Sequence, residues 1–156
     1  MAAESYILLK DIQGEKERLF KTSSKLVCRG ELLLVLPRIK VIPRKDGKPT
    51  HTHQLASDTS VTLYCSEHDV APLSDYEYHL LYAIKSREAR YDVFQKDLLD
   101  WGSKLKPESQ VYVTLPSKAD LPNQHVLSII KYIGPLSEER GVRFGVEIMV
   151  SIHMTL

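Results

Sequence analysis

The sequence has few cysteines, no long hydrophobic run and almost no excess charge, and each shortage excludes a class of protein. Two cysteines in 156 residues are too few for a disulfide-rich secreted scaffold. The 21 basic and 20 acidic residues leave a formal net charge of +1, so no global basic field attracts nucleic acid or anionic lipid. Any electrostatic partner must therefore bind a local patch.

Apolar residues never run far enough to cross a bilayer. The longest apolar stretches, 32–36 and 126–130, are much shorter than the ~20 residues that a spanning helix needs. The N-terminus has no basic segment followed by an apolar stretch, so it does not resemble a secretory signal. We therefore expect a cytoplasmic protein with reduced cysteines and no membrane span.

Sequence motifs that are typical of enzyme active sites are missing. The chain has no G-x-S-x-G, no Walker-type glycine loop, no H-E-x-x-H and no dinucleotide fingerprint. Cys65 and His68 are close in sequence, but the partners of a nucleophilic cysteine usually come from distant parts of a chain. We therefore expect no catalytic residue and no cofactor, and we interpret Cys65 as a core residue of a strand.

Two local groups of side chains suggest binding, each with a simpler interpretation. His51, His53, Cys65 and His68 are zinc ligands by type, but a Cys₂His₂ site needs a second cysteine, so a polar loop with solvated histidines is the simpler interpretation. A basic stretch around an Asp-Gly turn lacks interleaved aromatics, which favours a solvated turn over a nucleic-acid site. Its members are Arg38, Lys40, Arg44, Lys45 and Lys48.

Hydrophobic periodicity predicts a β-rich first part, one helix and a second β-rich part. Apolar runs predict strands at 5–10, 32–36, 39–42 and 61–65, and later ones at 111–115 and 126–133. Ser74 and Glu77 have the spacing of a capping box, and apolar residues recur at helical spacing after them. We therefore expect one long amphipathic helix over about 74–97, with Trp101 and Gly102 as its stop.

Two glycine-containing segments near the C-terminal end carry the most specific motif. Residues 130–136 read I-K-Y-I-G-P-L, and residues 141–148 read G-V-R-F-G-V-E-I. Together they resemble the first half of a CAP-Gly domain, whose signature approximates V-R-Y-x-G-P-L, a short loop, and G-x-W-x-G-V-E-L. Upstream, residues 6–10, 65–70 and 74–94 resemble the N-terminal region of the cylindromatosis deubiquitinase (CYLD) family. The resemblance covers most of residues 5–148.

Some positions depart from the family pattern. Ser128 replaces a glycine, Lys131 replaces an arginine, and Arg143 stands where the groove tryptophan is typical. The later G-K-N-D-G loop does not follow, and the catalytic set of the ubiquitin-specific protease is missing from this sequence. The resemblance therefore implies a partial CAP-Gly unit and a chain that is not itself an enzyme.

The resemblance implies a domain organisation within an α+β fold. We expect a CYLD-like N-terminal domain over residues 1–106, consisting of a β-rich unit and the long helix. A partial CAP-Gly domain should follow over 107–148, with a divergent tail over 149–156. We also expect Val150 and Ile152 in that tail to add a last strand that covers an open sheet edge.

The resemblance also implies a function and a set of binding residues. CAP-Gly domains bind the acidic C-terminal tails of tubulin and end-binding proteins through glycine-loop backbone, basic side chains and an aromatic wall. The implied function is a non-catalytic interaction with tubulin tails or microtubule-associated partners. The alternative is a regulator of ubiquitin signalling, of the NF-kappa-B type, that competes for CYLD partners. The matching residues are Lys131, Gly134, Arg143, Phe144, Gly145 and Glu147.

Overall fold

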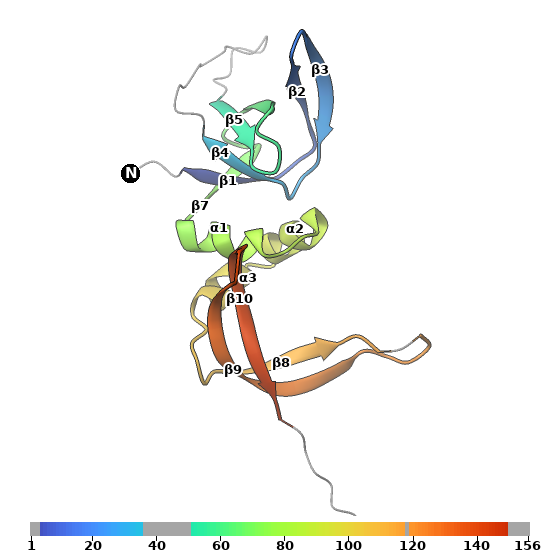
Figure 1. Ribbon diagram of the computed structural model, residues 1–156, viewed down its shortest axis with the longest axis vertical. Helices are drawn as coiled ribbons and strands as arrows, with labels where there is room; N and C mark the ends of the chain where they lie inside the picture. The colour runs from blue at the N-terminus through green and yellow to red at the C-terminus, as the bar shows by residue number, and fades with distance from the viewer. Residues whose placement is uncertain (1–3, 36–50, 118, 150–156) are drawn as a thin grey trace, which may run out of the picture. The chain divides into compact units, whose positions relative to one another are not determined.

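The computed structural model describes residues 4–35, 51–117 and 119–149 of the chain. The chain divides into two compact units, Met1–Ser103 and Lys104–Leu156, and each unit has its own antiparallel sheet (Figure 1). The α+β expectation is confirmed at this level, because the described residues combine these sheets with three short helices. The division lies close to residue 106, where we placed it from the sequence.

The first unit is built on a sheet with the strand order β3-β2-β6-β5-β4-β1-β7. Its strands in chain order are β1 (Ser5–Leu8), β2 (Ile12–Arg18), β3 (Lys21–Val27), β4 (Leu32–Val35), β5 (His51–Leu55), β6 (Val61–Cys65) and β7 (Val70–Leu73). β2 and β3 pair along their whole length, from Ile12 opposite Val27 to Arg18 opposite Lys21. By contrast, β2 pairs with β6 only near its middle, where Glu15 and Lys16 lie opposite Thr62 and Val61.

The largest hydrophobic cluster of the first unit lies on one face of this sheet, and β1 and β4 also bury Ile7 and Leu32 on the other face. In β6, Val61, Leu63 and Cys65 are fully buried, while the residues between them are half-buried. Leu8 and Leu33 from β1 and β4 belong to the same cluster. Burial of each such side chain contributes about 1.5–3 kcal/mol. Cys65 is thus the core residue expected, and both cysteines are free thiols.

Three short helices take the place of the single long helix expected over about 74–97. They are α1 (Asp75–Tyr82), α2 (Arg87–Gln95) and α3 (Leu98–Ser103). The capping box is confirmed, because the Glu77 amide donates to Ser74 Oγ at 3.1 Å and the Ser74 amide donates to Glu77 Oε1 at 3.0 Å. The prediction of one long helix was wrong because Ser86 caps a new helix. Its Oγ accepts a hydrogen bond from the Ala89 amide at 3.3 Å.

The predicted stop at Trp101 and Gly102 was also wrong, because both residues lie inside α3. The break falls earlier, at Asp97, whose backbone has φ 55° between α2 and α3. A left-handed residue at this position ends α2 and allows the chain to begin another helical turn. None of the helices in the described residues is long and apolar enough to span a membrane.

Arg90 of α2 stabilises the break between the first two helices. Its Nε donates to the carbonyl oxygens of Leu81 at 3.2 Å and Ile84 at 2.6 Å. Its Nη1 lies 3.6 Å from the Glu31 carboxylate, and the Arg90 side chain is only 14% exposed. The guanidinium therefore caps the Ile84 carbonyl, which lies beyond the end of α1, and gives the Leu81 carbonyl a second donor besides the Ile84 amide.

The second unit is a sheet with the strand order β10-β9-β8. Its strands are β8 (Gln110–Leu115), β9 (Gln124–Leu136) and β10 (Glu139–Ile148), so the strands predicted at 111–115 and 126–133 are confirmed and the second is longer than expected. Ser128 and Ile130 of β9 are buried. The expected strand at 39–42, the basic stretch at 38–48 and the tail strand through Val150 and Ile152 lie outside the described residues.

Candidate functional site

The residues implied by the motif lie on two neighbouring strands of the second unit. Lys131 and Gly134 are on β9, and the others are on β10. The register places Gly134 opposite Arg143 and Gly145 opposite Tyr132. The antiparallel pairing thus brings the two halves of the motif side by side.

A β-bulge at Lys131 changes which side chains share a face. Gly145 pairs with Tyr132 while the next residue, Val146, pairs with Ile130, so Lys131 is an extra residue of β9. Lys131 Nζ reaches Glu147 on β10 at 3.5 Å, whereas Tyr132 packs against Gly145. Gly145 and Glu147 are two residues apart on one strand and share a face. The consecutive side chains of Lys131 and Tyr132 therefore lie on the same face of the sheet.

The alternation of side chains along β10 defines this face, which we call the Tyr132 face. Its members are Lys131, Tyr132, Gly134, Arg143, Gly145 and Glu147. Phe144 lies between Arg143 and Gly145 and pairs with Ile133, so its half-buried ring belongs to the opposite face. The structure thus separates Phe144 from the rest of the predicted set. The aromatic residue beside the two glycines is Tyr132 instead, and Tyr112 on β8 lies farther along the same face of the sheet.

The Tyr132 ring covers both glycines of the face. A Cβ on Gly134 would lie 2.7 Å from Tyr132 Oη, and a Cβ on Gly145 would lie 3.1 Å from Tyr132 Cβ. Tyr132 Oη donates a hydrogen bond to the Pro135 carbonyl oxygen at 2.6 Å, which fixes the ring. Tyr132 nevertheless remains 44% exposed. The face therefore presents a fixed aromatic ring over a backbone without side chains.

Two carboxylates hold Lys131 beside this ring. Its Nζ donates to Glu108 Oε1 at 2.9 Å and Oε2 at 3.2 Å, and it lies 3.5 Å from Glu147 Oε2. The hydrogen bond to Glu108 is the main cause that raises the pKa of Lys131 above its usual value. Glu108 precedes β8, with φ 72°, and its amide donates to the Ile130 carbonyl at 2.7 Å. An acidic ligand of Lys131 must therefore compete with carboxylates already in place.

The second cation of the face is also paired. Arg143 Nη1 lies 2.5 Å from Glu139 Oε2, and the Arg143 side chain is 23% exposed. The two cations thus meet the carboxylates of Glu108, Glu139 and Glu147. The face is not a basic patch, and its character is set by the aromatic ring and the glycine backbone.

The sequence motif contains Tyr132 but does not reveal its role. A glycine two residues later on the same strand is the available signal, because adjacent aromatic and glycine positions on one face often pack together. Glu108 carried no signal, since it precedes β8 and its pairing with Lys131 on β9 depends on the register of separate strands. Glu139 lies four residues before Arg143 on β10, but this spacing does not bring side chains together in a regular strand. Both were therefore missed in the sequence.

The weaker zinc candidate gains no support from the described residues. No group of three or more His, Cys, Asp or Glu residues among them could hold a metal ion. His53 is buried, and its ring packs edge-on against Tyr6 with centroids 5.0 Å apart. The His68 side chain is 80% exposed and Cys65 is in the core, while the side chain of His51 lies outside the described residues.

Comparisons of the chain with family models, curated proteins and solved structures find no match. The interpretation of the site therefore depends on its geometry and on the motif.

Proposed function

We propose that this chain is a non-catalytic protein-interaction module whose Tyr132 face binds the acidic C-terminal tail of a partner, with tubulin as the first partner to test. The observation that supports this function is the fixed ring of Tyr132 beside Lys131 and over Gly134 and Gly145. The ring covers the glycine backbone, so the tail meets side chains: a tail carboxylate can pair with Lys131, and the exposed side of the Tyr132 ring can pack against an apolar side chain of the tail. The CAP-Gly resemblance supplies the partner class.

The carboxylates around Lys131 set the expected strength of binding. A tail carboxylate would replace Glu108 or Glu147 on Lys131, so one exposed ion pair is exchanged for another. Exposed pairs contribute only about 0–1 kcal/mol each, and the exchange adds little. We therefore expect weak binding that depends on the aromatic contact and decreases with salt.

Under this proposal the protein acts in the cytoplasm, in association with microtubules, and has no proteolytic activity of its own. The CAP-Gly and CYLD resemblance is the basis for this assignment. Effects on ubiquitin signalling would then follow from contacts with partners rather than from catalysis.

The test is co-sedimentation of the purified full chain with microtubules, with and without the tubulin tails, at low and high salt. We expect tail-dependent pelleting that Tyr132→Ala abolishes and Lys131→Gln weakens. Tyr76→Ala is the matched control, because Tyr76 is a 38% exposed tyrosine on α1 of the first unit, outside the Tyr132 face.

Two results would overturn the proposal. Pelleting that persists without the tails would show that the acidic tail is not the ligand. If the chain does not pellet at low or at high salt, the search should move to ubiquitin-pathway partners of the first unit. The chain would then compete with CYLD for those partners.

A further inference from the structure

The tip of the β2–β3 hairpin exposes two large apolar side chains. Leu19 and Phe20 form the turn between the strands and are 94% and 96% exposed. They therefore contribute almost nothing to the core of the first unit. Two-residue hairpin turns favour glycine, asparagine or aspartate, so turn chemistry does not account for an apolar pair here.

The outer half of the hairpin projects from the sheet. No residue from 15 to 26 is buried, although Gly14 and Val27 at its base are. Figure 1 shows the hairpin extending beyond the neighbouring strands of its unit. The apolar pair is thus at the end of a projection, where a partner surface reaches it without obstruction.

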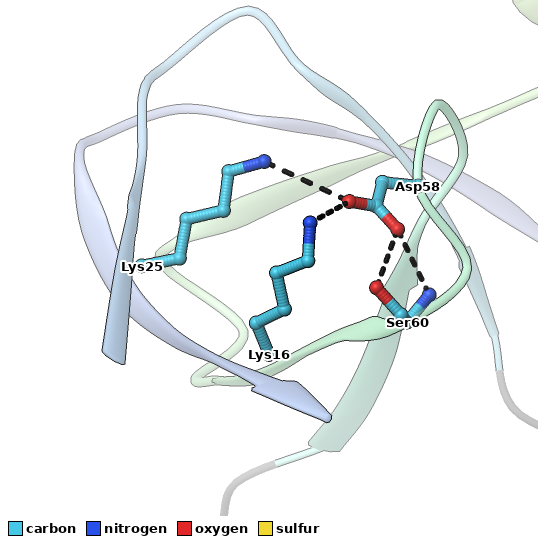
Figure 2. A network of polar contacts seen from close by, with 4 residues as sticks. All are labelled: Lys16, Lys25, Asp58 and Ser60. Atoms are coloured by element: carbon cyan, nitrogen blue, oxygen red, sulfur yellow. Dashed lines mark hydrogen bonds and ion pairs between the residues drawn. The ribbon is translucent and has the colours of Figure 1, made fainter. Parts of the chain in front are cut away.

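A polar network fixes the hairpin to the loop that precedes β6. Asp58 accepts a hydrogen bond from Lys16 Nζ at 3.0 Å, and Lys25 Nζ lies 3.8 Å from the same oxygen (Figure 2). The other carboxylate oxygen accepts from the amide of Ser60 at 3.1 Å and from its hydroxyl at 2.6 Å. One aspartate thus joins both strands of the hairpin to the sheet, which holds the tip in a defined position.

Two cations lie directly behind the apolar tip. Arg18 and Lys21 are opposite each other in the register, and no ion pair joins either side chain to another described residue. Like charges directly opposite destabilise a strand pair. An anionic surface in front of the tip would remove this repulsion.

We propose that this hairpin tip inserts into the interface of an anionic lipid bilayer. Leu19 and Phe20 enter the boundary between headgroups and acyl chains, while Arg18 and Lys21 bind anionic headgroups. Successive pairs along a hairpin are about 3.3 Å apart, so the apolar pair and the cationic pair form two levels parallel to a flat surface. One cation on each strand at the same level matches a planar anionic surface better than an apolar protein groove.

This site is separate from the proposed function, because it uses the first unit and none of the Tyr132 face. It also agrees with the near-neutral charge of the chain, since the cations that matter are local. Attachment of this kind is peripheral and needs no spanning segment.

The test is sedimentation of the full chain with vesicles of phosphatidylcholine alone and of phosphatidylcholine with phosphatidylserine. We expect binding to the anionic vesicles that Leu19→Ser with Phe20→Ser weakens at least about tenfold. Arg18→Gln with Lys21→Gln should remove the preference for phosphatidylserine. Tyr112→Ser with Leu121→Ser, which are 74% and 68% exposed in the second unit, is the matched control.

A second measurement tests the depth of insertion. The chain has one tryptophan, so Phe20→Trp in a Trp101→Phe background reports the tip alone. Its emission should shift to the blue on anionic vesicles and be quenched by brominated acyl chains. Failure of the chain to bind anionic vesicles, or binding unchanged by Leu19→Ser with Phe20→Ser, would overturn the proposal. If the chain does not bind anionic vesicles, the remaining partner for the tip is an apolar groove on another protein.

Discussion

Lys131 and Tyr132 are consecutive residues of β9 whose side chains lie on the same face of the sheet. A regular strand would direct them to opposite faces, and the bulge opposite Gly145 and Val146 removes that alternation. The cation and the aromatic ring of the candidate site are adjacent for this reason. The bulge is therefore the structural feature on which the proposed function depends.

Gly134→Ala should displace the Tyr132 ring. The added Cβ would lie 2.7 Å from Tyr132 Oη, so the hydrogen bond to the Pro135 carbonyl must break. We expect a loss of about 0.5–1.5 kcal/mol in the free energy of unfolding and a changed near-ultraviolet circular dichroism signal. Tyr132→Phe, which removes only the hydroxyl and its hydrogen bond, should reproduce the loss of stability. An unaltered spectrum for Gly134→Ala would contradict the packing described here.

Glu108→Gln should release Lys131 for an external carboxylate. The variant removes the main charge that raises the pKa of Lys131, so this pKa should fall toward 10.5 in an NMR titration. The interaction that raises the pKa of Lys131 stabilises the folded state while the lysine is protonated, and this stabilisation is lost as the pH rises through the folded-state pKa. The variant has less of this stabilisation to lose, so its stability should fall less above about pH 10.5. Affinity for an acidic peptide should increase several-fold. Unchanged affinity would mean that Lys131 is not part of the binding site.

Asp58→Asn should reduce the sensitivity of the first unit to acid. Hydrogen bonds from Ser60, followed by that from Lys16, hold the pKa of Asp58 well below its usual value of 3.8. A lowered carboxyl pKa stabilises the fold above pH 3.8, and this contribution is lost as the pH falls through the folded value. The variant should be less stable at neutral pH and lose less stability on acidification, as measured by denaturant unfolding across pH. Asp92→Asn, at an exposed position on α2, is the matched control for the substitution itself.

Arg90→Met should destabilise the first unit by about 2–4 kcal/mol. The change leaves the carbonyls of Leu81 and Ile84 without the guanidinium, and it leaves the carboxylate of Glu31 largely buried without its cation. Adding Glu31→Gln should recover part of the loss, because the uncompensated charge is then removed. Equal stability of the single and double variants would show that the ion pair contributes nothing and that the carbonyl bonds account for the effect.

Local signals in the sequence were sufficient for some elements of the fold. The β6 strand was predictable because Val61, Leu63 and Cys65 alternate with less buried residues. The start of α1 was predictable because Ser74 and Glu77 satisfy each other's backbone within one turn. These features depend on neighbouring residues alone.

Other elements were missed because their local sequence carries no clear signal. The β2–β3 hairpin is largely polar and its turn has no glycine, so neither its alternation nor its turn chemistry indicates strands. The break before α2 was hidden because apolar residues keep helical spacing across it. In the candidate site, five of the six residues named from the motif share one face, but the bulge at Lys131 and its partner Glu108 are determined by strand pairing.

The most direct test of the central claim is an NMR titration of the labelled full chain with a tubulin tail peptide. The account predicts amide shifts at Gly134 and Gly145 and a shift of the Tyr132 ring, and it predicts that both amide shifts are lost in Tyr132→Ala. Shifts that are absent from these positions, or that survive in Tyr132→Ala, would contradict binding at the Tyr132 face.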